Sequence, residues 1–211
     1  MRVGVSGYYG FQNAGDEAIL EAIVQEVRAR GHQAVVFSNN PAETAQRYGV
    51  EAVKRTHPLE VWKALGQIDL LLSGGGGLLQ DKTSSLSLWY YLTMMGLARR
   101  RGKAVYVFNQ SLGPLSQRGE RRVRRALRGV PCYFRDEGSL EYGRGLGLEV
   151  HLGADPALLL PSAAGGTRAQ HGGAGAQVRH RGGQRQPAQT GRPAAGGGPR
   201  GGGSSPATGL R

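Results

Sequence analysis

The sequence predicts a doubly wound α/β domain, and three observations support this prediction. Short apolar runs of strand length alternate with helix-like segments throughout residues 1–162. Most of the runs are apolar without interruption, as expected for strands of a parallel sheet that helices cover on both faces. Glycines and polar residues collect where the apolar runs end, which is where the ligand-binding loops of such a sheet lie. About 160 residues suffice for one Rossmann-like core of this kind.

The expected elements follow the chain in order. We expect strands at residues 2–6, 33–38, 51–53, 68–73, 104–109, 131–135 and 149–152, each a short apolar run. We expect helices at residues 16–30, 41–48, 58–65, 86–101, 117–128 and 137–142. The first helix has Ile19, Ile23 and Val27 on one face and ends before Gly31, where a glycine is favoured. The third begins with Pro58, which suits the first helical turn.

The composition changes abruptly after Ser162. Residues 163–211 contain no Asp, Glu, Lys, Phe, Tyr or Trp, and they hold seven arginines and fifteen of the 36 glycines. Such a segment buries too little apolar surface to offset its ordering entropy, so we expect a folded domain at 1–162 and a disordered Gly/Ala/Arg-rich tail at 163–211. These amino acids have codons beginning with two G or C bases, so we hypothesise that the tail is a frameshift product. A natural low-complexity linker is the alternative.

The positive charge of the chain is concentrated in that tail. Of the formal net charge of +12, the tail arginines supply +7, which leaves 12 − 7 = +5 for residues 1–162. No nucleic-acid-binding motif accompanies the charge, so we expect no nucleic-acid partner. The remaining basic cluster fits the solvated face of a helix, with Val123 and Leu127 turned inward, better than a polyanion site. Its members are Arg118, Arg121, Arg122, Arg124, Arg125 and Arg128.

The remaining composition favours a cytoplasmic protein without a metal. The single cysteine, Cys132, excludes an internal disulfide, fits a reducing compartment and lies in an expected strand. The chain starts directly in a strand pattern with no signal peptide, and no apolar run approaches the roughly 18 residues of a membrane span. The histidines show no metal-ligand spacing.

The loop between the first strand and the first helix, residues 7–16, is the first candidate binding loop. It is neither a dinucleotide fingerprint nor a P-loop, but it leads into a helix N-terminus that could receive an anion. Asp16 lies in the first helical turn, where the positive helix end should favour the ionised carboxylate that a base or hydroxyl acceptor needs. The alternative is an ordinary capping carboxylate.

The second candidate loop follows the strand at residues 68–73 and consists of Gly74, Gly75, Gly76 and Gly77. Four glycines there imply that something approaches the backbone closely. An anion held by successive N–H groups is one possibility, and tight packing of strand against helix is the other. The polar residues 81–85 that follow could reach a sugar or an anion, or could cap the next helix.

Two further charged residues lie at strand ends. Arg135 could bind a phosphate or carboxylate in bidentate fashion, and the alternative is a salt bridge to Asp136 or Glu137. Asp155 could belong to the site, although Asp-Pro is also an ordinary turn.

Together these loops resemble the polysaccharide pyruvyl transferase family, in particular its cell-wall branch. The matching stretches are GYYGFQNAGDEAIL (7–20), SGGGGLLQD (73–81), QSLGPL (110–115), FRDEGS (134–139) and ADPA (154–157). Each is weak alone, but five in the family's order, each in the expected loop, are specific together. The resemblance covers about residues 1–160.

The resemblance implies both a fold and a reaction. The fold is one half of a glycosyltransferase-B-like protein, whose active site lies between two Rossmann-like halves. The reaction transfers an enolpyruvyl group from phosphoenolpyruvate to a sugar of a cell-wall polysaccharide precursor, forming a pyruvate ketal and releasing phosphate, without a further cofactor. In the best-known branch the acceptor is an N-acetylmannosamine of a lipid-linked precursor, and S-layer homology domains bind the product. A lipid-linked or polymeric acceptor implies possible peripheral membrane association.

The resemblance also assigns residues. It places the family's catalytic aspartate at Asp16 and its donor-binding arginine at Arg135, with Asn13 and the glycines 74–77 as further candidates for substrate contacts. The family's second half, with its catalytic histidine and basic donor-binding residues, has no match here, so we expect the chain alone to be inactive or nearly so. The alternatives are a nucleotide-sugar glycosyltransferase of similar fold and a non-catalytic polyanion-binding protein.

Overall fold

The computed structural model describes residues 1–82 and 84–160. The expectations that the tail at 163–211 is disordered and a frameshift product lie outside these residues.

The described residues form seven strands, six α-helices and one short 3₁₀-helix. The strands are β1 (Arg2–Ser6), β2 (Gln33–Ser38), β3 (Glu51–Lys54), β4 (Leu70–Gly74), β5 (Ala104–Gln110), β6 (Cys132–Phe134) and β7 (Val150–Leu152). The helices are α1 (Ala14–Ala29), α2 (Pro41–Tyr48), α3 (Pro58–Gln67), α4 (Ser85–Arg100), α5 (Gln117–Ala126), α6 (Glu137–Gly145) and the 3₁₀-helix η1 (Pro156–Leu159).

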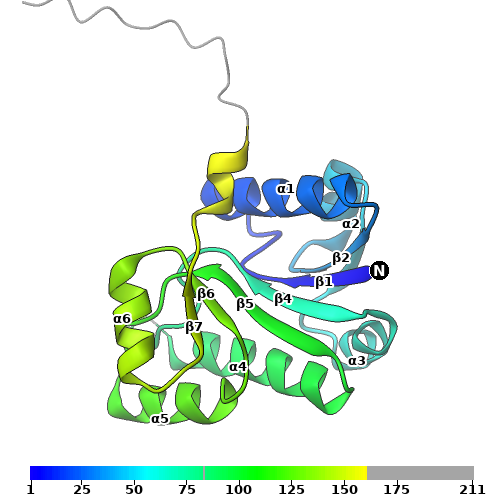
Figure 1. The fold of residues 1–211 in the computed structure, drawn as a ribbon. Helices are drawn as coiled ribbons and strands as arrows, with labels where there is room; N and C mark the ends of the chain where they lie inside the picture. Colours follow the sequence, from blue (N-terminus) through cyan, green and yellow to red (C-terminus); the bar gives the residue numbers. More distant parts are fainter. Residues whose placement is uncertain (83, 161–211) are drawn as a thin grey trace, which may run out of the picture. The chain divides into compact units, whose positions relative to one another are not determined.

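All seven strands are parallel and lie in one sheet (Figure 1). Their order is β3-β2-β1-β4-β5-β6-β7, so the chain first builds outward from β1 in one direction and then, from β4, in the other. The predicted doubly wound, Rossmann-like α/β fold is confirmed. Where the order reverses, between β1 and β4, the loops leave in opposite directions and open a crevice at the carboxyl edge.

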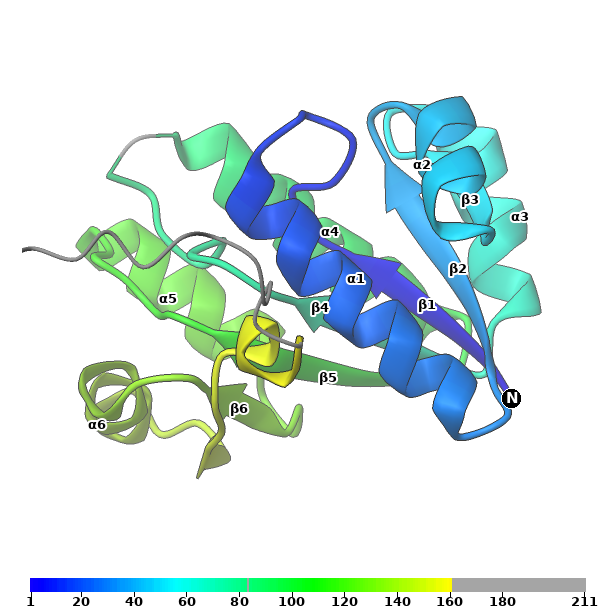
Figure 2. The ribbon, with the colours of Figure 1, turned by 90° about the horizontal axis from the view of Figure 1, so that it is seen from above.

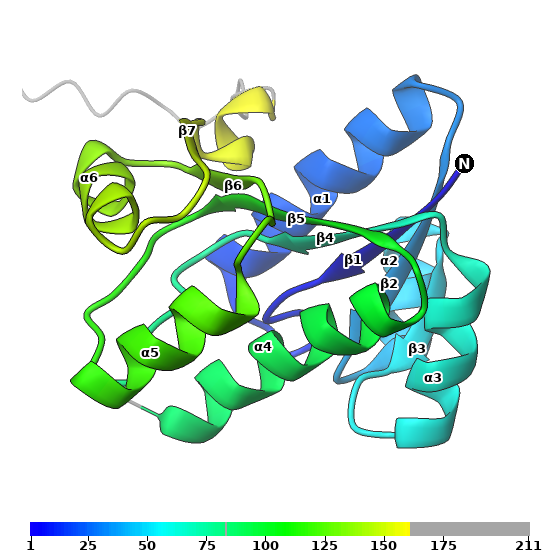
Figure 3. The ribbon, with the colours of Figure 1, turned by 60° about the horizontal axis from the view of Figure 1, so that its bottom comes forward.

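Helices cover both faces of the sheet and divide the core into two clusters (Figures 1 and 3). On one face, α1 packs over β1 and its neighbours through residues such as Leu20 and Ile23. On the other face, α3, α4 and α5 bury side chains including Leu65, Met95 and Val123. The strands lie between the two clusters, which is why their sequences are apolar without alternation.

The predicted helix and strand boundaries differ from the observed ones for local reasons. Helix α1 begins at Ala14 rather than at residue 16, because the Asn13 side chain accepts a hydrogen bond from the Gly15 amide at 3.1 Å and caps the helix there. Strand β4 begins at Leu70, since the amide of Ile68 still bonds to Ala64 at the end of α3. Helix η1, which packs on α1, was not predicted.

The predicted burial of three side chains is confirmed. Val123 and Leu127 are fully buried and turn the arginines of α5 outward, and Cys132 is buried in β6. No helix within residues 1–82 and 84–160 is long and apolar enough to cross a membrane.

Candidate functional site

The loops that follow β1, β4, β6 and β7 meet at the carboxyl edge of the sheet, beside the N-terminus of α1 (Figure 2). They enclose an open pocket of about 330 Å³. Its lining residues are Asn13, Gly15, Asp16, Ala18, Ile19, Gly76, Gly77, Arg135, Asp155 and Ala157. Five of the seven residues expected at the site therefore line one pocket, although they come from three separate loops.

Asp16 is the third residue of α1 and is not its cap, because Asn13 takes that role. No described residue donates a hydrogen bond to its carboxylate. Burial raises the pKa of Asp16, the neighbouring Glu17 carboxylate raises it further, and Arg135 lowers it by less. The net shift is upward, because desolvation of the half-buried carboxylate and the Glu17 charge outweigh the favourable charge of Arg135.

Gly76 lets the glycine-rich loop lie against Asp16. Its backbone has φ = +72°, and a Cβ atom there would lie 2.7 Å from Asp16 Oδ1. The next residue, Gly77, is exposed, and a Cβ atom would meet nothing within 4 Å. The carboxylate position therefore depends on Gly76 and not on Gly77.

Gly74 and Gly75 lie beneath the pocket and do not line it. The carbonyl of Gly74 accepts a hydrogen bond from the buried Tyr9 hydroxyl at 2.8 Å. A Cβ atom at Gly75 would lie 2.4 Å from Ile19 Cγ2 of α1. These two glycines serve the close packing of strand against helix, which was the alternative reading of the loop.

Arg135 is held in place by two side chains that the sequence did not connect to it. Its Nε donates to Ser111 Oγ and its Nη1 donates to Asp155 Oδ2, each at 2.9 Å. Its Nη2 has no hydrogen-bond partner among the described residues. About 31% of the side chain remains exposed, so the guanidinium is fixed in direction while one edge stays open to the pocket.

Asp136, one of the two expected alternative partners of this arginine, has another role. Asp136 caps α6 by accepting from the Ser139 amide at 2.7 Å, and it also accepts from the Ser111 and Ser139 hydroxyls. Burial alone would raise the pKa of Asp136, but these hydrogen bonds together outweigh it and the pKa is lowered. Ser111 thus bridges Asp136 and Arg135. Sequence reasoning missed Ser111, although it lies in the matching stretch at 110–115.

Asp81 and Ser84, which follow the glycine loop, both have structural contacts. Asp81 accepts from the Ser116 amide at 2.7 Å and from the Ser116 hydroxyl at 2.6 Å, and these bonds lower its pKa. Ser116 is the cap of α5, and Ser84 caps α4. The capping alternative therefore holds for Ser84, and Asp81 joins the loop to α5. Among the described residues, no three metal-ligating side chains gather.

Aromatic side chains support the first loop from its outer side. Tyr8 and Phe11 stack with ring centres 4.0 Å apart, and both are partly exposed. Arg55 lies over the ring of Tyr90 at 4.1 Å and donates to the carbonyl of Gly7 at 3.1 Å. The loop that carries Asn13 and Asp16 is therefore braced by a cation–π cluster, which the sequence analysis did not identify.

A model of the family described as polysaccharide pyruvyl transferase matches residues 13–185. The match covers more than half of the chain and includes every residue that lines the pocket. The chain belongs to the polysaccharide pyruvyl transferase family. No curated protein matches the chain.

The similarity of this pyruvyl transferase family member to solved structures is low. Triphenylmethane reductase of Citrobacter sp. is 21% identical, with a TM-score of 0.40 over 64% of this chain and 48% of that chain. A ribokinase-like protein of Enterococcus faecalis is 12% identical, with a TM-score of 0.42 over 72% and 57% of the two chains. The chain thus spans about half the length of the reductase.

Proposed function

We propose that this domain supplies one side of an active site that transfers pyruvate, as a ketal, from phosphoenolpyruvate to a sugar of a cell-wall polysaccharide precursor. The observation that carries the proposal is the convergence of Asp16 and Arg135 on one pocket. The pocket lies at the topological switch point of a sheet from a family of polysaccharide pyruvyl transferases.

The roles of the two residues follow from the chemistry. Protonation of carbon 3 of phosphoenolpyruvate makes carbon 2 electrophilic, and a sugar hydroxyl then attacks carbon 2 and loses its proton. Loss of phosphate and attack by a second hydroxyl close the ketal. Asp16 suits removal of the hydroxyl proton, because its raised pKa makes it a better base than an exposed aspartate. The open edge of Arg135 suits the phosphate or carboxylate of the donor.

The charge of the pocket implies that this side is not sufficient. Its lining residues include one guanidinium, Arg135, and two carboxylates, Asp16 and Asp155. Phosphoenolpyruvate carries both a carboxylate and a phosphate, so a pocket with excess negative charge binds it poorly. We therefore propose that cationic groups from beyond the residues lining this pocket complete the donor site, and that the 211-residue chain alone binds the donor weakly and transfers little.

Titration of phosphoenolpyruvate into the 211-residue chain, followed by ³¹P NMR, tests the donor assignment. Arg135→Gln should weaken binding at least about tenfold, since hydrogen bonds to charged groups contribute roughly 1.5–3 kcal/mol. The matched control is Arg144→Gln, an exposed arginine of α6 outside the pocket. Equal binding by the wild type and Arg135→Gln would overturn the donor role of Arg135.

A second experiment distinguishes pyruvyl transfer from the alternative functions. The chain is incubated with phosphoenolpyruvate and an N-acetylmannosamine-containing lipid-linked acceptor, and the sugar product is analysed by mass spectrometry. Ketal formation by the chain alone would contradict the proposed need for further cationic groups. Tighter binding of a nucleotide diphosphate sugar than of phosphoenolpyruvate would favour a glycosyltransferase. Because the proposed donor is a cytoplasmic metabolite, we propose a cytoplasmic reaction, with membrane association through the acceptor.

A further inference from the structure

Helices α4 and α5 lie side by side on the face of the sheet opposite α1 (Figures 1 and 3). Residues of both helices line a groove of about 540 Å³. Its lining includes the apolar residues Leu92, Gly96, Leu97 and Ala126. The lining also includes Trp89, Thr93 and the arginines Arg99, Arg100, Arg122 and Arg125. The groove lies away from the pocket that contains Asp16.

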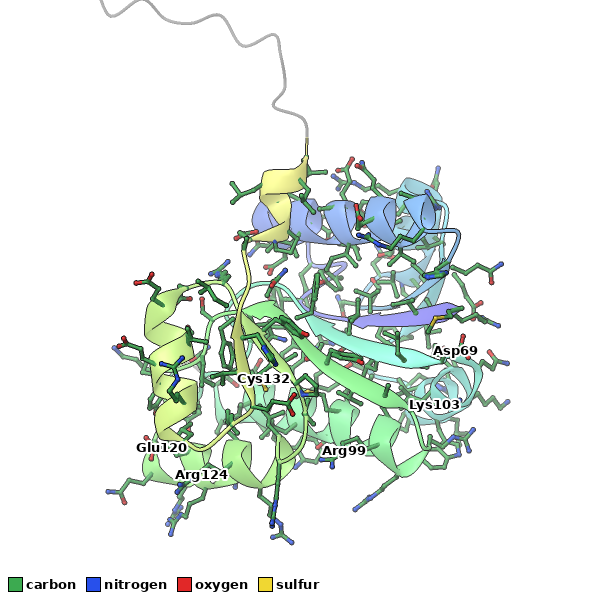
Figure 4. The ribbon with its side chains drawn as sticks, in the orientation of Figure 1. Asp69, Arg99, Lys103, Glu120, Arg124 and Cys132 are labelled. Atoms are coloured by element: carbon green, nitrogen blue, oxygen red, sulfur yellow. The ribbon has the colours of Figure 1, made fainter. Side chains whose placement is uncertain are left out.

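The arginines of this face outnumber the nearby carboxylates, of which Asp81 is close enough to Arg122 for the arginine to help lower the pKa of Asp81. Helices α4 and α5 together contain seven arginines and one acidic residue, Glu120, which accepts a hydrogen bond from Tyr142 at 2.7 Å. None of the seven forms an ion pair with a carboxylate of the described residues. Arg99 and Arg124 donate to backbone carbonyls, at 3.1 Å and 2.9 Å, and both lie at the outer surface of the helices (Figure 4).

Exposed apolar side chains stand next to this charge. Leu86 is 75% exposed and Trp89 is 57% exposed, and they are three residues apart in the first turns of α4, so they project from the same side. In a helix that packs on a sheet, leucine and tryptophan side chains normally point toward the sheet and are buried. Tryptophan beside arginine, with leucine next to it, is the composition of a surface that lies at a membrane interface.

We propose that the face formed by α4 and α5 docks on an anionic lipid bilayer. The arginines then contact lipid phosphates, while Trp89 and Leu86 enter the headgroup region. Nucleic acid fits this face less well, because phosphate contacts would satisfy the arginines but leave the apolar residues of the groove and Leu86 in water. The occupant that matches both the charge and the apolar surface is a bilayer with anionic headgroups.

Bilayer docking here would leave the proposed active site accessible. Helix α1, which carries Asp16, lies on the opposite face of the sheet (Figure 1). The N-termini of α4 and α5 lead toward the carboxyl edge, so a docked bilayer would adjoin this edge without covering the pocket. The inference stands on the α4–α5 face alone and does not depend on the proposed reaction.

Binding to vesicles tests the proposal with the full 211-residue chain. We expect co-sedimentation with vesicles of phosphatidylglycerol and phosphatidylcholine, loss of binding with pure phosphatidylcholine, and weaker binding as salt is raised. The double variant Arg122→Gln/Arg125→Gln should bind about 25-fold more weakly, at about fivefold per arginine. In a Trp62→Phe variant, where Trp89 is the only tryptophan, anionic vesicles should shift the fluorescence to shorter wavelength.

A charge-matched control decides whether the face or the net charge is responsible, because residues 163–211 contain seven more arginines. Arg47→Gln/Arg144→Gln removes two exposed arginines from α2 and α6. The proposal is overturned if this control loses binding as strongly as the α5 variant, or if anionic vesicles leave the emission of Trp89 unchanged. It is also overturned if the α5 variant loses affinity for duplex DNA but not for vesicles.

Discussion

The position of a single carboxylate, that of Asp16, depends on a residue from another loop. Gly76 approaches Asp16 so closely that even a methyl group would displace the carboxylate, whereas Gly77 faces open space. In the sequence the four glycines are equivalent. Their contacts in the structure distinguish Gly74 and Gly75, which serve packing, from Gly76 and Gly77, which line the pocket.

We predict that Gly76→Ala destabilises the domain by about 1–2 kcal/mol, since alanine is strained at positive φ and its Cβ would press on Asp16. Gly77→Ala, the matched control, should change the stability by less than about 0.5 kcal/mol. Urea unfolding measures both, and an NMR titration of the Asp16 carboxyl should be altered only in Gly76→Ala. Equal effects of the two substitutions would show that Gly76 does not position the carboxylate.

A second residue-scale prediction concerns stability against pH. The folded pKa of Asp16 is raised, so folding favours its neutral form, and this contribution is present at low pH and lost as the pH rises through the folded pKa. Asp16→Asn should therefore gain in melting temperature relative to the wild type between pH 3 and pH 7, by about 1–3 °C in a domain of this size. Calorimetry at the two pH values measures the gain, and a relative loss at pH 7 would contradict it.

Sequence reasoning found the residues of the pocket better than their partners. Asp16, Arg135 and Asp155 could be identified because charged residues at the carboxyl ends of parallel strands converge. The pairing of Arg135 with Asp155, rather than with an adjacent acid, could not be identified. Twenty residues separate the two in the sequence, and their loops adjoin because β6 and β7 are neighbours in the sheet. The pKa of Asp16 likewise depends on burial, which a sequence does not show.

At the scale of elements, the order and type of helices and strands followed from periodicity, and their ends followed from caps. Asn13 moved the start of α1 by two residues because its side chain satisfies the amide of Gly15. Helix η1 was not predicted, since one turn after Asp155 has no apolar period. Element boundaries are thus set by single hydrogen bonds that composition does not reveal.

Helices α1 and α2 are joined by a buried hydrogen bond whose removal should be measurable. The Tyr48 hydroxyl donates to Glu17 Oε2 at 2.7 Å, and Glu17 Oε1 accepts from the Gly10 amide at 2.8 Å. Tyr48→Phe leaves the buried carboxylate with one donor fewer, so we predict a loss of about 2 kcal/mol in urea unfolding. In the control, Tyr106→Phe, the hydroxyl has no partner among the described residues, and a loss as large there would refute this role of Tyr48.

At the scale of the whole molecule, composition and family membership place the end of the domain differently. The composition predicts that the folded domain ends near Ser162, whereas the family match continues to residue 185. Between 163 and 185, Val178 is the only aliphatic residue besides alanine, and no aromatic residue occurs. Such a segment buries little apolar area, and at about 25 cal/mol per Å² it contributes little to the free energy of unfolding.

We therefore propose that residues 1–162 hold the complete cooperative fold, and predict that chains ending at residues 162, 185 and 211 unfold with the same free energy, to within about 0.5 kcal/mol. If the free energy of unfolding also falls equally steeply with urea concentration in the three chains, no surface beyond residue 162 becomes buried on folding. If the chain ending at 162 is less stable than the one ending at 185, residues 163–185 pack on the domain as the extent of the family match implies. The frameshift hypothesis would then be wrong for that segment, because an out-of-frame sequence has no reason to fit this core.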